Sequence, residues 1–401
     1  MPEPYAPPRY DVITMGRIGV DLYPLRTGVP LAEADTFGKF LGGSPANVAV
    51  AAARLGRRTA LITRTGQDPF GEYLHDTLRE FGVDDRWVTS VEEYPTPVTF
   101  CEIFPPDDFP LYFYRLPKAP DLEIRESELE REPIRTARVF WMTGTGLCAE
   151  PSRTATLAAL AHRGTSGTTV FDLDWRPVFW PDPGAARVHY AQALAHATVA
   201  VGNPEECAIA TGESEPHAAA EALLAAGVDL AVVKQGPKGV LAVHRDGTRV
   251  EVPPVPVEVV NGLGAGDAFG GALCHGLLAG WELERVIRFA NAAGAVVAAR
   301  LACSAAMPYE AEVERVLAGG PVPPDPSRPG APAGAGPTSP PHAPGDGTPP
   351  SAPGRAPAHP PGGTAPPSVP AHPPGGTARP GDGPAPRGEG PALPGAPGGA
   401  P

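Results

Sequence analysis

The chain has 401 residues and is acidic, with 45 Asp and Glu against 32 Lys and Arg; it has no basic stretch, which argues against nucleic acid as a partner. It contains no run of about 18 apolar residues, so no segment is expected to span a membrane. The five cysteines are odd in number and form no Cys-x-x-Cys pair, which argues against a disulfide framework or a zinc site and indicates the cytoplasm.

The composition changes along the chain. Residues 10–319 have the composition of a globular α/β protein, whereas residues 320–401 are mostly Pro, Gly and Ala and contain no aromatic residue. Such a segment cannot bury enough apolar surface to offset its ordering entropy, so we expect a disordered tail. An imperfect repeat begins at Pro357 and again at Pro370. The tail is either a low-complexity extension or a proline-rich docking segment.

In the first half of the chain, residues 10–15 and 59–62 are expected to be strands. Residues 44–55 and 70–81 are expected to be helices, the first with Ser44 as its N-cap and Pro45 at its first position. Residues 98–103 and 111–114 alternate like strands, and no helical segment separates them. They are therefore predicted to form a hairpin.

From residue 138 onward, strands and helices alternate regularly. The expected strands are 139–142, 169–173, 199–201 and 230–234, and the expected helices between them are 153–163, 185–195 and 216–226. This alternation predicts a mostly parallel sheet with helices on both faces. Ligands bind such sheets at the carboxyl ends of the strands.

A glycine-rich segment runs from Asn261 to Asp267 and opens a long apolar helix. Its glycines permit a tight turn, and the free N–H groups of a helix N-terminus attract an anion. An Asp at that position can take the proton of an attacking hydroxyl while the amides stabilise a phosphoryl group. The alternative is a glycine-rich turn in which the Asp only caps the helix.

A second segment places Gly42 and Gly43 before an Ala-rich helix that contains Asn47. Paired glycines before a helix again suggest a close approach of the backbone to a ligand. Asn47 lowers helix propensity at an interior position, so it has either a ligand or a packing role.

These two segments resemble the two signature motifs of the PfkB carbohydrate kinase family, and the resemblance extends over residues 10–319. It implies a ribokinase-like three-layer αβα sandwich with a small β-sheet lid made from about residues 17–39 and 98–116, and a homodimer formed through the lid. It also implies phosphoryl transfer from ATP, with Mg²⁺, to a sugar hydroxyl. Asp267 would be the catalytic base, and Gly264, Ala265 and Gly266 would form the anion hole. Family members commonly have Asp-Thr where this chain has Asn261-Gly262, so neither residue is assigned a role.

The resemblance also suggests where the metal and the nucleotide bind. Asn203 and Glu206 are similar to the family motif that orders Mg²⁺ and its waters; the alternative is an ordinary helix start with acidic first-turn residues. Five residues lie in regions that border the nucleotide in the family, with close helix packing as the alternative for each: Lys234, Gly236, Gly239, Asn291 and Gly294.

Three stretches, residues 15–24, 40–47 and 172–180, resemble the 5-dehydro-2-deoxygluconokinases of myo-inositol degradation. This resemblance implies a sugar-derived keto-acid that is phosphorylated at its terminal 6-hydroxyl. Asp21, Gly42, Gly43 and Asn47 would bind the sugar, and Arg115 and Arg176 would bind its carboxylate, because an Arg fork suits a carboxylate. The alternative for each Arg is a surface ion pair.

Other functions stay open at this point. A 2-keto-3-deoxygluconate kinase would use a similar acid, and a fructokinase or ribokinase would need no carboxylate-binding Arg. A sugar-binding protein that has lost activity is the non-enzymatic alternative. The presence of Asp267, Asn203 and Glu206 argues against it.

Overall fold

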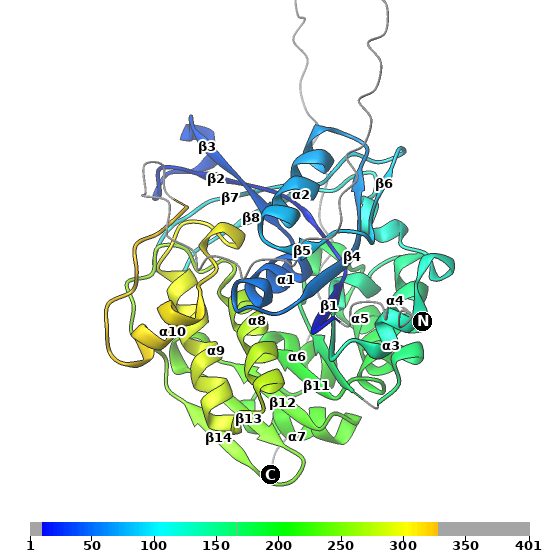
Figure 1. Cartoon of the computed structure of the whole chain (residues 1–401), viewed down its shortest axis with the longest axis vertical. Coiled ribbons are helices and arrows are strands. Elements are labelled where there is room, and N and C mark those ends of the chain that lie inside the picture. Colours follow the sequence, from blue (N-terminus) through cyan, green and yellow to red (C-terminus); the bar gives the residue numbers. More distant parts are fainter. Residues whose placement is uncertain (1–9, 166, 328–401) are drawn as a thin grey trace, which may run out of the picture. The chain divides into compact units, whose positions relative to one another are not determined.

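The computed structural model describes residues 10–165 and 167–327, so the predicted tail lies outside the described residues from residue 328 onward. Ten strands form the main sheet, and four form a separate sheet (Figure 1). The path through the main sheet is β14 (Arg249–Val252), β13 (Val240–His244), β12 (Leu230–Lys234), β11 (Val199–Gly202), β10 (Thr168–Asp172), β9 (Val139–Thr143), β1 (Val12–Met15), β4 (Thr59–Gly66) and β5 (Val83–Asp84), while β6 (Val88–Val91) also pairs with β4.

Along this path, strands β4, β1, β9, β10, β11 and β12 pair in parallel. The hairpin β13–β14 extends the sheet beyond β12 with antiparallel pairing. Consecutive residues of a central strand pack against different helical layers. In β9, Val139 and Trp141 belong to the cluster formed with α8 and α9, whereas Phe140 and Met142 belong to the cluster formed with α4 and α5. This period of two is expected of a strand that is covered on both faces.

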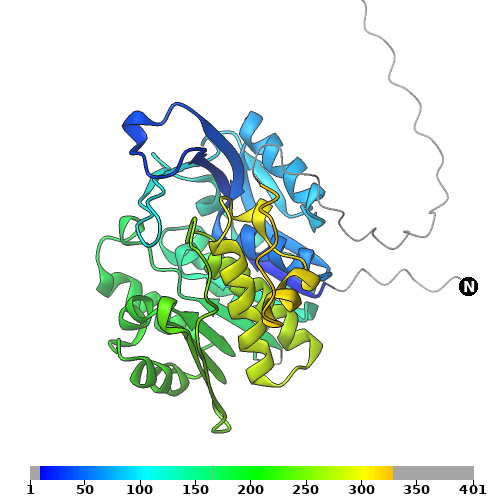
Figure 2. The same ribbon diagram turned by 90° about the vertical axis from the view of Figure 1, so that its left-hand side faces the viewer.

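Helices cover both faces of the main sheet, which gives the predicted αβα sandwich (Figure 2). One layer contains α1 (Ser44–Arg54), α2 (Pro69–Glu80), α8 (Ala265–Ala279), α9 (Leu283–Ala298) and α10 (Glu310–Leu317). The other contains α3 (Arg131–Thr136), α4 (Ser152–Arg163), α5 (Pro183–Leu194), α6 (Pro204–Thr211) and α7 (Pro216–Ala226).

The smaller sheet has the order β3 (Phe37–Gly42), β2 (Gly19–Pro24), β7 (Val98–Cys101) and β8 (Leu111–Tyr114). Strands β7 and β8 form the predicted hairpin, and β2 pairs with β7 in parallel. Figure 1 shows this sheet beside α2, at one end of the sandwich. We call it the lid sheet.

One boundary differs from the prediction. Gly43, and not Ser44, is the N-cap of α1; its φ is 100°, a value that favours glycine, and Ser44 is the first helical residue. Packing against the main domain also continues beyond residue 319. The Leu301 N–H donates to Asp325 Oδ2 (2.7 Å), and the Ala302 N–H donates to Ser327 Oγ (3.3 Å). Residues 320–327, which end the described part, thus form a strap that is hydrogen-bonded to the main domain.

Candidate active site

The glycine-rich segment forms the N-terminus of α8. Gly264 caps this helix with a φ of 81°, and a Cβ added there would lie 2.6 Å from Cys303 Sγ. A Cβ on Gly266 would lie 3.4 Å from Lys234 Nζ, so an ammonium group lies beside the helix start. The Asp267 N–H already donates a hydrogen bond to the Gly264 carbonyl (3.1 Å). The amides of Ala265 and Gly266 are therefore the better candidates for binding an anion.

Asp267, in the first turn of α8, pairs with the second motif. Asn47 Nδ2 donates to Asp267 Oδ2 at 2.8 Å, across the contact between α1 and α8. The other polar atom of this amide, Asn47 Oδ1, is buried and has no hydrogen-bond partner, so it can accept a hydrogen bond from a ligand hydroxyl. Burial raises the pKa of Asp267, while hydrogen bonds from Asn47 and Ser44 oppose the rise. A carboxylate with a raised pKa suits a general base.

Asp21, on strand β2 of the lid sheet, lies close to this pair. A Cβ on Gly42 would lie 2.2 Å from the Asp21 carboxyl group, so only a glycine at position 42 leaves room for that side chain. The Tyr23 hydroxyl donates to Asp21 Oδ2 (2.9 Å) and lies 2.8 Å from Cys303 Sγ. Burial raises the pKa of Asp21 to about 6, and the Tyr23 hydroxyl and the charge of Arg17 oppose the rise. The predicted sugar-binding residues Asp21, Gly42 and Asn47 thus come together beside Asp267.

On the other side of the site, Lys234 at the end of β12 lies 3.8 Å from Asp172 Oδ1 at the end of β10. Burial raises the pKa of Asp172 despite the nearby ammonium group. Asn203 and Glu206 form a capping box at the start of α6: the Glu206 N–H donates to Asn203 Oδ1 (2.9 Å), and the Asn203 N–H donates to Glu206 Oε2 (2.8 Å). Their structural role is therefore evident, and one carboxylate oxygen of Glu206 is left for other partners.

The remaining residues of the predicted nucleotide site have mixed surroundings. Gly236 has a φ of 55° and open space around its Cα, whereas a Cβ on Gly239 would lie 2.0 Å from the Val252 carbonyl oxygen. Asn291 Nδ2 donates to the Pro253 carbonyl (2.8 Å). A Cβ on Gly294 would lie 2.9 Å from the Ala265 carbonyl oxygen, so this glycine lets α9 pack closely on the start of α8.

The two predicted carboxylate-binding arginines differ in their partners. Arg115 donates two hydrogen bonds to Asp121 (2.9 and 2.7 Å), and both side chains are nearly buried. A ligand carboxylate would therefore compete with Asp121. Arg176 pairs with Asp174 Oδ1 at 3.0 Å and retains a buried Nε atom without a hydrogen-bond partner.

The prediction did not include Arg17, Asp172, Asp174 or Tyr23. Residues 172–176 were assigned to the site only through Arg176, although Asp172 ends a core strand and Asp174 directly follows it. The loop that contains Arg17 directly follows β1, which is the same signal. Asn261 also has a defined role: its side-chain amide donates to the Leu301 carbonyl (2.7 Å) and accepts from the Leu263 N–H (3.0 Å). An ionised Asp at this position could accept from Leu263 but could not donate to Leu301.

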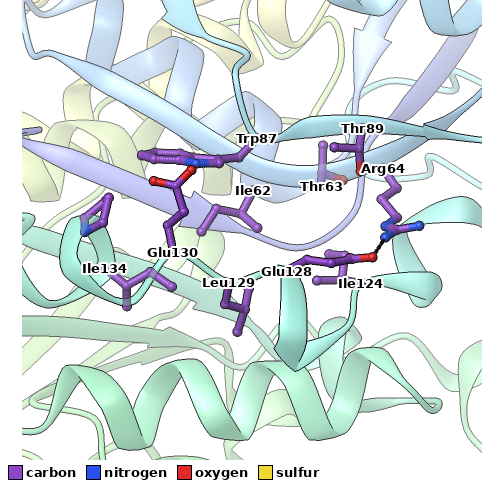
Figure 3. A pocket seen from close by; sticks show the side chains of 11 residues that line it. Ile62, Thr63, Arg64, Trp87, Thr89, Ile124, Glu128, Leu129, Glu130 and Ile134 are labelled. Atoms are coloured by element: carbon purple, nitrogen blue, oxygen red, sulfur yellow. Dashed lines mark hydrogen bonds and ion pairs between the residues drawn. The ribbon is translucent and has the colours of Figure 1, made fainter.

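A cavity elsewhere in the main domain is unrelated to this site. It is lined by β4, β6 and the segment 124–134, and none of the predicted site residues contributes to it (Figure 3). Its charged pair, Arg64 and Glu128, closes one end (Figure 3). Within residues 10–165 and 167–327, no helix is long and apolar enough to cross a membrane.

A sequence model described as pfkB family carbohydrate kinase matches residues 10–310, which include both motifs, Asp267 and Asn47. The chain belongs to the pfkB family of carbohydrate kinases. It is therefore a phosphotransferase that acts on an alcohol group of a sugar-type acceptor.

Relatives of this kinase match it over most of their length. A 5-dehydro-2-deoxygluconokinase of Clostridium tetani is 32% identical over 314 residues, which are 77% of this chain and 92% of the relative. One of Photobacterium profundum is 34% identical over 305 residues, which are 74% of this chain and 92% of the relative. The crystal structure of a fructokinase with bound ATP from Xylella fastidiosa has a TM-score of 0.68 at 25% identity and covers 77% of this kinase and 99% of its own chain.

Proposed function

We propose that this kinase uses ATP and Mg²⁺ to phosphorylate 5-dehydro-2-deoxy-D-gluconate at its terminal hydroxyl, giving the 6-phosphate in myo-inositol degradation. The names of its relatives in Clostridium tetani and Photobacterium profundum support the substrate. The observation that carries the chemistry is the Asn47–Asp267 pair at the N-terminus of α8. It places a base in the first turn of α8, beside the free amides of that turn and beside Asn47 of α1, whose Oδ1 is an unpartnered hydrogen-bond acceptor.

The proposed reaction follows from these positions. The acceptor hydroxyl donates to Asn47 Oδ1 or to Asp267, and Asp267 takes its proton as the oxygen attacks the γ-phosphorus in line; the bond from this phosphorus to the bridging oxygen breaks, and ADP leaves. The amides of Ala265 and Gly266 and the ammonium group of Lys234 stabilise the charge on the transferring phosphoryl group. Closure of the lid sheet over the acceptor would exclude water and prevent hydrolysis of ATP.

Asn203, Glu206 and Asp172 are proposed to face the magnesium ion. Glu206 has an oxygen outside its capping box, and Asp172 Oδ1 is buried without a hydrogen-bond partner. No group of three or more His, Cys, Asp or Glu side chains among the described residues could hold a metal by itself. This donor set fits Mg²⁺, which keeps several waters and binds nucleotide phosphates. When bound, the ion neutralises charge on the β- and γ-phosphates.

A direct experiment measures turnover of the purified kinase with ATP and a panel of acceptors. We expect the highest kcat/KM with 5-dehydro-2-deoxygluconate, a lower value with 2-keto-3-deoxygluconate, and the lowest with fructose or ribose. Preference for 2-keto-3-deoxygluconate would move the assignment to that acid, and preference for a neutral sugar would exclude both acids. Sugar binding without ATP turnover would favour a binding protein.

We also propose a homodimer formed through the lid sheets. Phe100 packs between Phe37 and Tyr114, with ring centroids 5.7 and 5.5 Å apart, and Tyr114 and Leu116 are 67% and 88% exposed. Exposed aromatic residues on a small sheet are typical of a surface that pairs with another copy. Light scattering of the wild type and of Tyr114→Lys tests this proposal: a dimer that becomes monomeric supports it, and a monomeric wild type contradicts it.

The location that we propose is the cytoplasm. All five cysteines, which lie in the described part of the chain, are unpaired, and four of them are buried. Free thiols persist in reducing compartments.

A further inference from the structure

Two arginines from distant parts of the chain meet at one buried carboxylate. Arg17, in the loop after β1, lies 3.5 Å from Asp174 Oδ2, and Arg176 lies 3.0 Å from Asp174 Oδ1. The Thr145 hydroxyl also donates to Asp174 Oδ2, at 3.1 Å. The side chain of Asp174 is only 3% exposed. Asp174 therefore uses both of its oxygens to hold two guanidinium groups next to each other.

Both guanidinium groups keep capacity for a further acceptor. The Nε atoms of Arg17 and Arg176 are buried and have no hydrogen-bond partner. An unpartnered Nε alone does not identify a site, because Arg64 beside the cavity of Figure 3 has one too. The difference is that Arg64 faces one carboxylate alone, whereas here two arginines share one. Because the charges of these arginines also act on Asp21, Asp267, Asp172 and Glu206, it is the two unpartnered Nε–H donors, and not an excess of positive charge, that are left for an anion.

The backbone at Asp174 supports a functional role for this arrangement. Among the described residues, Asp174 is the only residue other than glycine with a positive φ, 33°. Strained backbone of this kind is concentrated at functional sites. The ion pairs of the two Asp174 carboxylate oxygens with Arg17 and Arg176 keep both guanidinium groups in place.

The position in the sheet indicates which anion binds. In the order β12, β11, β10, β9, β1, the proposed nucleotide-side residues Lys234 and Asn203 lie at the end of β12 and directly after β11. Arg17 follows β1, at the opposite end of this row, and precedes Asp21 by only four residues. Arg17 therefore lies toward the acceptor half of the site, where Asp21 and Asn47 lie, and Arg176, which follows β10 in the middle of the row, is held beside it by Asp174.

We propose that Arg17 and Arg176, held together by Asp174, bind the carboxylate of the acceptor, and that Arg17 is a specificity-determining residue of this kinase. This inference rests on the proposed function, which supplies the acid substrate. In this proposal Arg17 takes the place of Arg115 as the second arginine of the carboxylate site, since the hydrogen bonds of Arg115 go to Asp121. A pair of guanidinium groups offers the parallel N–H donors that a carboxylate accepts.

The test compares steady-state kinetics of the wild type, Arg17→Met, Arg176→Met and Arg17→Lys, with 5-dehydro-2-deoxygluconate and with neutral fructose as acceptors. For each Met variant we expect KM for the acid to rise roughly 10- to 150-fold, as for the loss of one charge-assisted hydrogen bond. KM for fructose and KM for ATP should change little. Arg17→Lys should recover part of the loss, because it keeps the charge but not the planar fork.

Arg64→Met is the matched control, since Arg64 is also nearly buried, paired with a carboxylate and unpartnered at Nε, but lies at the cavity of Figure 3. Arg64→Met should leave KM for the acid and KM for fructose unchanged. Melting temperatures of all variants identify any loss of folding, and Arg17→Lys keeps the test decisive if a Met variant unfolds.

The outcomes separate the inference from the function on which it rests. A wild type that does not prefer the acid to fructose overturns the proposed substrate. A wild type that prefers the acid, with Met variants that keep the same preference, overturns the carboxylate site alone. Met variants that lower kcat equally for both acceptors would also overturn it, because the arginines would then act on the transferring phosphoryl group.

Discussion

At the scale of single residues, Asp267 is the group on which the proposed chemistry depends. Asp267→Asn keeps the shape and the contact with Asn47 but removes the proton acceptor. We expect kcat to fall by on the order of 10²–10⁴, with little change in ATP affinity and melting temperature. Turnover and nucleotide titration of the variant test this expectation. A kcat near that of the wild type would show that another group takes the proton.

Asp21 offers a prediction on pH. Because burial raises its pKa from 3.8 to about 6, the folded state holds a proton that the unfolded state releases between these two values. Stability contributed by this residue is therefore highest below pH 3.8 and falls as pH rises toward 6. Other groups near this carboxyl are Arg17, Asp267, Tyr23, Thr99 and the Cys101 and Cys303 thiols.

Asp21→Asn should remove this loss. We expect the difference in melting temperature, variant minus wild type, to grow as pH rises from about 4 to 6 and to remain positive at pH 7. At the same time KM for the acceptor should rise, because the carboxylate that we propose to bind a hydroxyl of the acceptor is gone. Melting curves across this pH range, together with kinetics at pH 7, test both statements. A difference in melting temperature that does not depend on pH would contradict the assigned titration.

At the scale of elements, helix α8 has a strained glycine at each end, and these two glycines form a matched pair. Gly264 and Gly280 have φ values of 81° and 68°, but only Gly264 has a close neighbour, Cys303, for an added Cβ. Gly280→Ala should lower stability by about 1–2 kcal/mol, the cost of a left-handed conformation, with kcat unchanged. Gly264→Ala should cost more and should also lower kcat, because the start of α8 must move. Equal effects of the two substitutions on kcat would contradict an anion-binding role for this helix start.

Strong local patterns made most elements predictable. The central strands are short apolar runs separated by helical segments, so β9 to β12 and α4, α5 and α7 were predicted to within a few residues. The β13–β14 hairpin was missed, although Asp246-Gly247 is a common hairpin turn and Gly247 has a φ of 96°. Strands β5 and β6 were missed because each is short and depends on pairing with β4.

The active site was less predictable than the fold because partners cannot be deduced from one residue's neighbours in the sequence. Arg115 follows a predicted strand and has the chemistry for a carboxylate, but Asp121, six residues later, occupies it. Arg17 has the same chemistry, and its partner Asp174 is 157 residues away. Only the parallel order of β1, β9 and β10 brings these two residues together.

At the scale of the whole molecule, the strap of residues 320–327 is linked by hydrogen bonds to the glycine-rich segment of the candidate active site. Asp325 accepts from the Leu301 N–H, and the Leu301 carbonyl accepts from Asn261 in the glycine-rich segment. Arg300, with a fully buried side chain, donates to the Pro323 carbonyl (3.5 Å). Removing the strap would leave buried polar groups unsatisfied, at about 1–3 kcal/mol each.

Two truncations separate the strap from the rest of the tail. A chain that ends at Gly319 should melt at a lower temperature and have a lower kcat than the full chain. A chain that ends at Ser327 should match the full chain in both, since residues 328–401 contain no aromatic residue and few large apolar ones. Thermal melts and kinetics of the three proteins are the measurement. A fall in the melting temperature of the longer truncation product would show that residues beyond 327 contribute to folding.

The lid sheet enters the chain as two insertions, β2–β3 between β1 and α1, and β7–β8 between β6 and α3. Asp21, Gly42 and Arg17 lie in or beside the first insertion, whereas Lys234, Asn203 and Asp267 lie far outside both. Asn47 and Arg176, the other residues proposed to bind the acceptor, lie outside both insertions, on α1 and after β10. On the proposed roles, the gene therefore divides the choice of acceptor between the first insertion and the core, and a new sugar specificity would need changes in both.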